Sequence, residues 1–554
     1  MTLMTLAQRI EASQSAADAG VVRFVEGDES HVVEWARILE QAAGVAGNLQ
    51  ALGVGPGRHV ALLGPTTPAL VVAIEGVWLC GATVVVLPLP MRLSSIEAFV
   101  EQTRVRIANA DTDLLIADPA LAGFLEPAPG DPPIVLLDDL TARRPRPWER
   151  PAADPDGLAL LQFTSGSTSD PKGVMLPHRT ICTNLDAMVE AAGLDHDQDV
   201  LVSWLPLYHD MGLIGLLGLP MTHALNLVLA APQDFLGAPG RWMQWMSDFH
   251  GTVTAGPNFS YALAARALRR MAPGTLDLSR WRIGLNGAEP VDPAAVDSFV
   301  ELARPQGLDP RAMFTVFGMA EATLAVTFPP PFSGMDVDVV DRHTLELERL
   351  AVPADPAADP VQVRRLAKLG RPVPGLEIRI TDPLTGNVMV DREAGELEIR
   401  GTSVTPGYYN RPDVTAATFH DGWLRTGDLG YLVDGELVVC GRLKDIIIVG
   451  GRNVFPEDVE RAVGELEGVR AGNVIAFGVE RRSGREGIVV VAEAREGNVV
   501  TIREAVAHCV RDTVGLPPEV VLVMPGSLPK TSSGKLQRSL CRNRYLDEDL
   551  QLAW

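Results

Sequence analysis

A loop rich in glycine and hydroxyl-bearing residues carries the clearest chemical signal in the chain. An apolar run ends at Phe163, and the following loop closes with Pro171-Lys172-Gly173 after Thr164, Ser165, Gly166, Ser167 and Thr168. Glycine lets backbone N–H groups approach an anion closely, the hydroxyl groups add donors, and the lysine adds a mobile charge. This composition is typical of a loop that binds a triphosphate, although an ordinary serine-rich surface turn shares it. A Walker A loop is excluded, because that motif needs Gly-Lys-Ser/Thr at the start of a helix.

Side chains suited to nucleotide chemistry recur later in the chain. An aromatic ring such as that of Phe317 suits a purine and a carboxylate such as that of Glu321 suits Mg²⁺, although these residue types alone do not assign either role. Asp428 can accept hydrogen bonds from two hydroxyl groups, and Lys535 lies in a loop rich in Lys, Ser and Gly. Core packing for Phe317 and a plain surface loop around Lys535 are the alternatives. No Cys–His or Ser–His arrangement that would indicate covalent catalysis is evident.

Alternating strands and helices must position these residues. Through the first three hundred residues, a helical stretch over 70–79 stands among apolar strand-like runs at 60–63, 84–87, 114–117, 134–137, 158–163, 225–230 and 281–285. Strands buried on both faces, with helices between them, favour largely parallel α/β layering. We therefore expect an α/β fold whose large N-terminal domain contains two layered α/β subdomains.

The pattern changes in the second half of the chain. Short strands and tight turns from about 379 to 439 predict a small β-barrel-like subdomain, in a β-rich region of about 335–440. Residues 325–366 are rich in Pro and Asp and show little periodicity. A smaller α/β unit then follows, with elements expected at 456–466, 487–493, 502–513 and 520–524. We expect a large domain over 1–441 and a small one over 446–554, with the chemistry at their junction.

Composition narrows the class of function. The 554 residues include 48 Lys and Arg against 70 Asp and Glu, and the formal net charge of -22 would repel nucleic acid. Five cysteines are scattered without a CxxC pair, which fits a reducing cytosol rather than disulfides or a zinc site. The apolar stretch 69–91 is broken at Gly81 and is better explained by a buried helix and strand than by a membrane span. These features predict a cytoplasmic multidomain enzyme with no nucleic-acid partner.

Together these segments resemble the adenylate-forming superfamily of acyl-CoA synthetases, luciferases and peptide-synthetase adenylation domains. The resemblance runs from about Phe24 to Leu546 and is strongest to the fatty acyl-AMP ligases. Besides the loop at 161–174, it rests on segments in the family's order: Trp204-Leu-Pro-Leu-Tyr-His-Asp-Met-Gly212, Asn286-Gly-Ala-Glu-Pro290, Phe314-Thr-Val-Phe-Gly-Met-Ala-Glu321, Trp423-Leu-Arg-Thr-Gly-Asp428, Gly441-Arg-Leu-Lys-Asp445 and Leu528-Pro-Lys-Thr-Ser-Ser-Gly-Lys-Leu-Gln-Arg538. It implies activation of a carboxylic acid by ATP and Mg²⁺ to an acyl adenylate, with release of pyrophosphate.

The resemblance also implies roles for individual residues. Lys535, His209 and Thr164 would be catalytic, and Glu321 would ligate Mg²⁺; a structural histidine is the alternative for His209. Residues 442–445 would be a hinge for a mobile small domain, with Lys444 either at its pivot or merely exposed. The ATP- or AMP-binding residues would be Thr164, Ser165, Gly166, Ser167, Thr168, Lys172, Gly287, Ala288, Glu289, Phe317, Gly318, Met319, Ala320, Asp428, Arg442 and Lys535. Those at the acyl substrate would be Trp204, His209, Asp210, Met211, Gly256, Asn258 and Gly318.

Two departures from the CoA-forming pattern favour the acyl-AMP ligase branch. Where CoA ligases usually have Tyr-Gly-x-Thr-Glu, this chain has Phe317-Gly-Met-Ala-Glu321, and about 49 positions separate Glu321 from Gly370. That spacing resembles the insertion that restrains the small domain in acyl-AMP ligases and disfavours transfer to CoA. The compact stretch at 419–425 and the presence of Lys172 are, in contrast, similar to CoA ligases.

The acid and its acceptor are predicted only by class. The apolar Met211–Met221 run and the absence of an amine-binding Phe-Asp-x-Ser motif favour a hydrophobic acid without an amino group. The acceptor would be an acyl carrier protein or a separate transfer enzyme, in lipid or natural-product biosynthesis. The alternative is an acyl-CoA ligase, for which CoA would be a further substrate. A non-catalytic adenylate-binding protein is disfavoured, because Lys535, Glu321 and Asp428 are all present.

Overall fold

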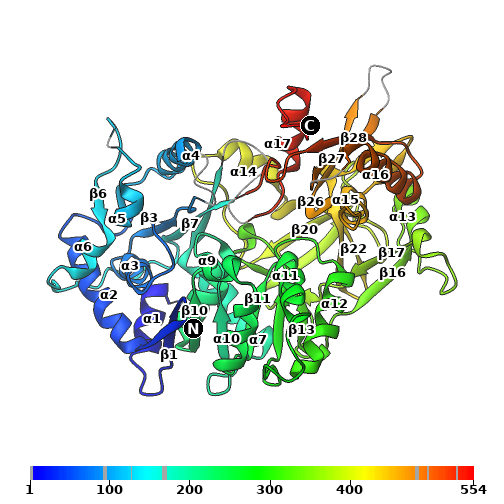
Figure 1. The fold of residues 1–554 in the computed structure, drawn as a ribbon. Helices are drawn as coiled ribbons and strands as arrows, with labels where there is room; N and C mark the ends of the chain where they lie inside the picture. Colours follow the sequence, from blue (N-terminus) through cyan, green and yellow to red (C-terminus); the bar gives the residue numbers. More distant parts are fainter. Residues whose placement is uncertain are drawn as a thin grey trace.

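The first sheet of the large domain positions the hydroxyl-rich loop. A computed structural model describes residues 4–90, 96–126, 128–164, 171–480, 486–495, 498–531 and 534–553. Within these ranges a six-stranded sheet has the order β6–β5–β3–β4–β7–β8 (Figure 1), with strands β3 (His59–Leu63), β4 (Thr83–Val86), β5 (Leu114–Ala117), β6 (Ile134–Leu136), β7 (Leu158–Thr164) and β8 (Lys172–Pro177). The strands predicted here are confirmed to within one or two residues. β8 returns antiparallel to β7, so that Thr164 and Lys172 are cross-strand neighbours.

A second sheet positions the remaining motifs of the large domain. Its seven strands have the order β13–β12–β11–β9–β10–β1–β2 and comprise β1 (Val21–Glu26), β2 (Glu29–Glu34), β9 (Val200–Ser203), β10 (Asn226–Ala230), β11 (Val253–Gly256), β12 (Ile283–Asn286) and β13 (Met313–Thr315). All neighbours are parallel except the β1–β2 hairpin. The predicted parallel layering is thereby confirmed, with β12 beginning two residues later than expected. Helices α7 (His178–Ala192), α9 (Pro232–Gly237), α10 (Gly240–Asp248), α11 (Asn258–Leu268) and α12 (Pro293–Ala303) accompany this sheet.

The apolar stretch near residue 75 is a buried helix followed by a strand. α3 (Pro68–Leu79) has 12 residues, begins after a Thr67 side chain that accepts from the Leu70 amide, and packs on α2 (Trp35–Gln50). Glu75 is fully buried in α3 and accepts a 3.0 Å hydrogen bond from the Gln14 amide of α1 (Leu6–Gln14). Across the described ranges, no helix combines the length and apolarity needed to cross a bilayer.

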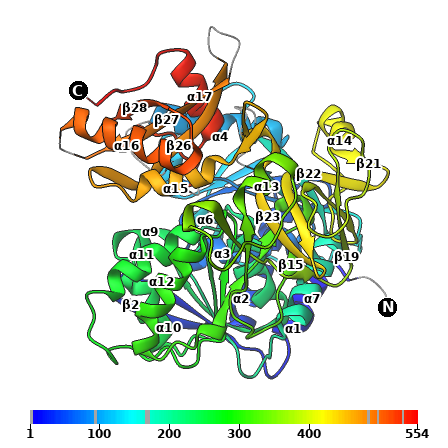
Figure 2. The same cartoon turned by 90° about the vertical axis from the view of Figure 1, so that its right-hand side faces the viewer.

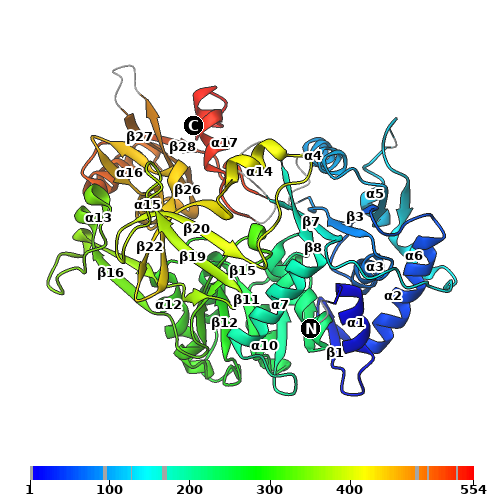
Figure 3. The same ribbon diagram turned by 180° about the vertical axis from the view of Figure 1, so that it is seen from behind.

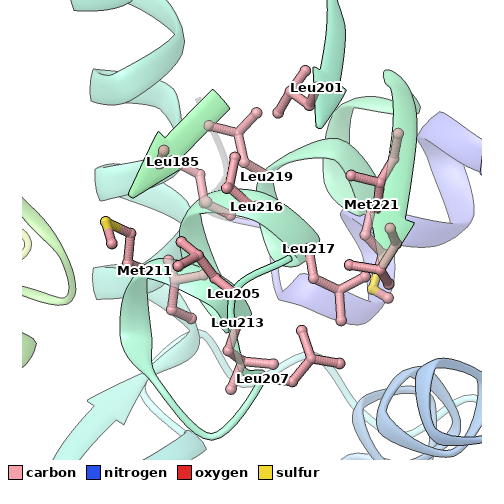
Figure 4. Packing of buried hydrophobic residues seen from close by; sticks show 14 of the residues in the cluster. Leu185, Leu201, Leu205, Leu207, Met211, Leu213, Leu216, Leu217, Leu219 and Met221 are labelled. Atoms are coloured by element: carbon pink, nitrogen blue, oxygen red, sulfur yellow. The ribbon is translucent and has the colours of Figure 1, made fainter. Parts of the chain in front are cut away.

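A π-helix occupies the apolar run after the Trp204–Gly212 segment. η2 (Met211–Gly218) is continued by α8 (Leu219–His223), and the Asp210 side chain accepts from the Met211 amide at 2.8 Å. Figure 4 shows Leu216 and Leu219 directed toward Leu201 of β9, whereas Leu217 and Met221 lie on another side. π-turns are frequent at functional sites because the wider turn redirects side chains.

The β-rich part is antiparallel and includes the segment that the sequence left without periodicity. β16 (Val337–Asp341) pairs with β17 (Val363–Ala367), and α13 (Arg342–Glu348) follows β16 directly. Beyond them a five-stranded sheet contains β19 (Leu376–Thr381), β20 (Gly395–Gly401), β21 (Phe419–His420), β22 (Trp423–Val433) and β23 (Glu436–Arg442). Figure 3 shows β19, β20 and β22 below the small domain.

The small domain has its own hydrophobic core. It contains β24 (Ile447–Val449), β25 (Arg452–Val454), α15 (Pro456–Gly464), β26 (Val469–Glu480), β27 (Glu486–Ala494), α16 (Val499–Val514), β28 (Glu519–Val523) and α17 (Arg538–Leu546). β26, β27 and β28 form one sheet, and a buried cluster extends from Ile447 to Ala553. In Figure 2 this domain, coloured orange to red, lies over α9, α11 and α12 of the large domain. The helices and strands predicted here are confirmed.

A seam of buried ion pairs joins the segment 337–367 to the small domain. Asp458 of α15 forms ion pairs with Arg364, at 2.9 Å from Nε, and with Arg342, at 3.3 Å from Nη1. Glu346 accepts from Arg452 Nε at 2.8 Å, and all the carboxylates of this seam are at most 4% exposed. Breaking a buried pair leaves an uncompensated charge, which costs about 3–5 kcal/mol. The seam therefore stabilises the observed arrangement of the two domains.

Candidate functional site

A cavity of about 1480 Å³ lies between the two domains, and most of the predicted site residues line it. On its wall are Thr164, Lys172, Trp204, His209, Asp210, Met211, Asn258, Ala288, Glu289, Phe317, Gly318, Met319, Ala320, Glu321, Asp428, Arg442, Lys444 and Lys535. These residues come from both sheets of the large domain, the β-rich part and the small domain. Ser165, Gly166, Ser167 and Thr168 lie outside the described residues.

Two predicted glycines support the wall without lining it. A Cβ on Gly256 would meet Ser260 Oγ at 2.3 Å, and one on Gly287 would meet Val316 Cγ2 at 2.8 Å. Both positions are therefore closed to larger side chains because of packing. Gly256, predicted to lie at the acyl substrate, is buried against Ser260 of α11 and does not line the cavity.

Asp428 and Arg442 form an ion pair because their strands place them opposite each other. The two residues are register partners in the β22–β23 ladder, and Arg442 Nε donates to Asp428 Oδ1 at 3.0 Å. Burial raises the pKa of Asp428, while Arg442 counteracts that effect. Since the bond uses Oδ1, the Oδ2 oxygen is the one best placed to accept from a ligand hydroxyl.

Glu321 is held by a tyrosine that the motifs did not reveal. Tyr408 donates its phenol O–H to Glu321 Oε1 at 2.8 Å, and the Lys172 ammonium lies 5.5 Å from the centre of the Tyr408 ring. Burial raises the pKa of Glu321. The sequence provides only a weak signal for Tyr408, which is one of two adjacent tyrosines in Gly407-Tyr-Tyr-Asn410. Tyr408 is brought to Glu321 by a long-range backbone bridge with Val174 of β8.

Lys535 enters the cavity from the small domain and faces carboxylates of the large domain. Burial lowers the pKa of Lys535, and Asp210 and Glu289 oppose that shift. Asp210 also pairs with His209 Nδ1 at 2.6 Å, and Glu289 accepts from the Phe259 amide at 2.6 Å. Lys535 is therefore a partly buried cation of the small domain whose charge is partly compensated by Asp210 and Glu289 of the large domain.

The loop that carries Lys535 is fixed by a second cluster of charges. Arg538, three residues later, pairs with Asp445 at 2.6 Å and with Glu460 at 3.0 Å. Asp445 belongs to the predicted hinge, and Glu460 belongs to α15. Arg538 therefore connects the Lys535 loop, the hinge segment and α15.

The apolar lining of the cavity falls into two groups. The inner group comes from one face of the second sheet and from η2, α7 and β15 (Ala325–Phe328), and includes Met188, Ala192, Leu201, Met211, Gly215, Leu216, Val253, Ile283, Leu285, Phe314, Leu324 and Phe328. The outer group comes from α9 and α11 and consists of Leu236, Phe259, Ala262 and Leu263. Leu236 is 46% exposed, whereas Leu201, Val253, Ile283 and Phe314 of the inner group are buried and Leu285 is partly buried. The cavity thus joins a charged chamber to deep apolar space.

The donor set fits Mg²⁺ bound together with phosphates. In the described part of the chain, no three His, Cys, Asp or Glu side chains converge to hold a metal by themselves. Mg²⁺ commonly takes one or two carboxylates and completes its shell with water and substrate phosphates. Glu321, a partly buried carboxylate held in place by the Tyr408 hydrogen bond to Oε1, matches that requirement.

Comparisons with known proteins agree with this geometry. Residues 11–409 match the family described as AMP-binding enzyme, and residues 451–541 match the AMP-binding enzyme C-terminal domain. A putative ligase of Mycobacterium tuberculosis is 41% identical over 514 residues, covering 91% of this chain and 93% of the relative. The medium-chain-fatty-acid–[acyl-carrier-protein] ligase JamA of Moorena producens is 32% identical, covering 99% and 96%.

The fold comparison gives the same result. A structure from studies of fatty acyl-adenylate ligases of E. coli and L. pneumophila superposes with a TM-score of 0.92 at 29% identity, covering 99% of this chain and 98% of that one. The match spans the large and the small domain together. The chain belongs to the AMP-binding enzyme family.

Proposed function

We propose that this protein is a fatty acyl-AMP ligase, which joins a fatty acid to the AMP part of ATP and releases pyrophosphate. The observation that carries the proposal is the single cavity in which Lys535, Glu321 and the Asp428–Arg442 pair surround one end of a deep apolar space. Relatives whose names include long-chain-fatty-acid–AMP ligase and fatty-acid–[acyl-carrier-protein] ligase support the reaction class.

The proposed step is a displacement at the α-phosphorus of ATP. A carboxylate oxygen of the acid bonds to that phosphorus as its bond to the bridging oxygen of pyrophosphate breaks, and no enzyme nucleophile takes part. Lys535 offsets the negative charge shared by the carboxylate and the α-phosphate, and His209 orients the carboxylate. Asp428 and Arg442 hold the ribose, Phe317 and Ala288 border the adenine, and Thr164 and Lys172 contact the phosphates. Mg²⁺, held by Glu321 with the phosphates, would neutralise charge on the leaving group.

We further propose the domain limits and the acceptor. Residues 1–441 form the adenylation domain, 442–445 the hinge around Lys444, and 446–554 the mobile lid. The reaction takes place in the cytoplasm. The acyl group then passes to an acyl carrier protein, an acceptor that the name of JamA gives for that relative. The seam at Asp458 and Glu346 supports this acceptor over CoA, because it resists the domain rotation that CoA transfer would require.

One reaction tests the proposal. Pure protein is mixed with Mg²⁺-ATP, CoA and a panel of fatty and aryl acids, and the products are measured by mass spectrometry. Acyl-AMP that accumulates without acyl-CoA is the expected result. Acyl-CoA as the main product would establish the CoA ligase alternative, and no adenylate with any acid would refute the assignment.

A further inference from the structure

The inner apolar group follows one face of the second sheet from end to end. Ladder partners share a face, and Val253 pairs with Ile283 and with Leu201, whereas Leu285 pairs with Phe314. All five line the cavity. Ile283 and Val253 are the first residues of β12 and β11, and the Asn286–Pro290 segment assigned to the nucleotide begins at the last residue of β12. The apolar space therefore extends beneath β13, β12, β11 and β9, from the nucleotide end of β12 toward its first residue.

The opposite wall keeps this space narrow. It is built by η2, α7 and β15, and Gly215 of η2 lies so close to Leu324 that an added Cβ would meet Leu324 Cδ2 at 2.8 Å. Phe314 and Phe328 meet edge to face, with ring centroids 5.2 Å apart. Because Phe314 belongs to the sheet and Phe328 to the opposite wall, their contact restricts the space between the two sides, which suits an unbranched alkyl chain better than a branched or aryl group.

The far end is closed by the C-terminus of α7, which an arginine fixes to the sheet. Arg282, next to β12, donates to the carbonyl oxygens of Ala192 at 3.2 Å and Gly193 at 2.9 Å. Its Nε donates to Asp199 at 2.8 Å, and the Asp199 side chain is fully buried. Because the Arg282–Asp199 ion pair holds it, the C-terminal end of α7, which forms the floor of the apolar space, resists displacement by a longer ligand.

The length of the sheet sets the length of the tunnel. β11 and β12 have 4 residues each, which corresponds to ~13 Å at a rise of about 3.3 Å per residue. Because carbon–carbon bonds of about 1.5 Å form a zigzag, an extended alkyl chain advances only about 1.3 Å per carbon, so roughly ten carbons span that distance. We infer that this enzyme selects straight, medium-length fatty acids, and that Ala192, with Met188 beside it, is the stop for the terminal methyl group. This inference rests on the proposed acyl-AMP ligase activity and adds the acid that it uses.

Two substitutions in the floor should move the chain-length limit in opposite directions. Ala192→Leu shortens the tunnel, so that the longest acids accepted by the wild type lose about tenfold or more in kcat/KM while shorter acids keep theirs. Met188→Ala lengthens the tunnel and raises kcat/KM for acids beyond the wild-type limit. Both are measured by acyl-AMP formation across saturated acids of increasing length, with thermal melts as a check on folding.

Matched controls separate the inner group from the outer group. Glu190→Leu adds the same side chain at an exposed position of α7 and should leave the length profile unchanged. Ala262→Trp fills the outer group and should also leave the profile unchanged, because the alkyl chain lies elsewhere. A profile that shifts in Ala262→Trp, or that stays at the wild-type limit in Ala192→Leu, overturns the inference. A wild type that adenylates no acid at all refutes the proposed function instead, so the two failures are distinguishable.

Discussion

Lys535 is the cation that the small domain contributes to the proposed reaction. It faces Asp210 and Glu289 across the domain boundary, and burial lowers its pKa. Removing one preorganised donor of this kind typically costs ~10²–10³-fold in rate. We expect Lys535→Ala to lose adenylate formation to about that extent while ATP binding, measured by calorimetry, stays near the wild-type value.

The control for Lys535→Ala is Arg503→Ala, which removes a positive charge from an exposed position on α16 of the same domain. It should leave adenylation unchanged. Normal adenylation by Lys535→Ala would contradict the role assigned to this lysine.

Tyr408 positions the carboxylate that is proposed to hold Mg²⁺. Tyr408→Phe keeps the ring under Lys172 but removes the hydrogen bond to Glu321, so the carboxylate loses its fixed orientation. We expect the concentration of Mg²⁺ needed for half-maximal activity to rise by about tenfold, since a lost hydrogen bond to a charged group costs about 1.5–3 kcal/mol. The KM for the acid should change little.

The neighbouring tyrosine provides the control. Tyr409 donates to Asp111 at 3.1 Å on the outside of the first sheet, so Tyr409→Phe should keep the wild-type Mg²⁺ requirement. Equal Mg²⁺ curves for Tyr408→Phe and the wild type would exclude the positioning role.

Residues could be predicted where a motif keeps them close in sequence. Asp428 and Arg442 were both found, and the β22–β23 register explains why they meet. Tyr408 could not be found, because 87 positions separate it from Glu321 and no local pattern links the two. The division of the apolar cavity lining into an inner and an outer group could not be predicted either, because strand register, not composition, decides which side chains share a face.

At the scale of elements, the seam of buried ion pairs between segment 337–367 and the small domain is proposed to favour a carrier protein over CoA as the acceptor. Asp458→Asn keeps the shape of the side chain but removes the charge that faces Arg342 and Arg364. The loss of a buried pair should free the small domain to rotate. We expect acyl-CoA to appear among the products, with a share several-fold above that of the wild type, measured by mass spectrometry.

A surface pair in the same region is the control for this experiment. Asp297 pairs with Arg365 at 3.0 Å, and both side chains are about half exposed (54% and 47%). Exposed pairs contribute only about 0–1 kcal/mol. Asp297→Asn should therefore keep the wild-type product ratio; a ratio unchanged in Asp458→Asn would show that the seam does not select the acceptor.

Elements with strong local patterns were predicted well, and this segment was not. The buried strands β3, β4 and β5 are continuous apolar runs bounded by turns, so the sequence alone indicates them. β16 and β17 contain charged residues and pair across about twenty positions, which a local pattern cannot show. Residues 325–366, which show little periodicity in the sequence, contain β15, β16, α13 and most of β17.

At the scale of the whole molecule, one buried carboxyl links stability to pH. Burial raises the pKa of Glu75 from 4.5 to about 8. Below pH 4.5 the folded and unfolded states both bind the proton, so this group's contribution is fully present. Between pH 4.5 and 8 only the folded state binds it, and the free energy of unfolding falls as the pH rises, by at most about 1.36 kcal/mol per unit.

Glu75→Gln should remove this loss of stability. The variant is expected to melt at a higher temperature than the wild type at pH 8 and to gain little at pH 5, as measured by calorimetry. Glu190→Gln, at an exposed position, should show no such pH dependence. A gain of equal size at both pH values would mean that Glu75 is ionised in the folded protein.

The seam also has a consequence for timing. The ion pairs of Asp458 and Glu346 hold the small domain over the cavity in the arrangement that places Lys535 inside it. A newly formed acyl adenylate is therefore retained in the cavity until several buried ion pairs break together. Chemistry would then be faster than release, as in many enzymes with closing lids. Rapid-quench experiments should show a burst of about one acyl-AMP per protein molecule, followed by a slow steady state. An acceptor that breaks the ion pairs of the seam would then determine the steady-state rate of turnover.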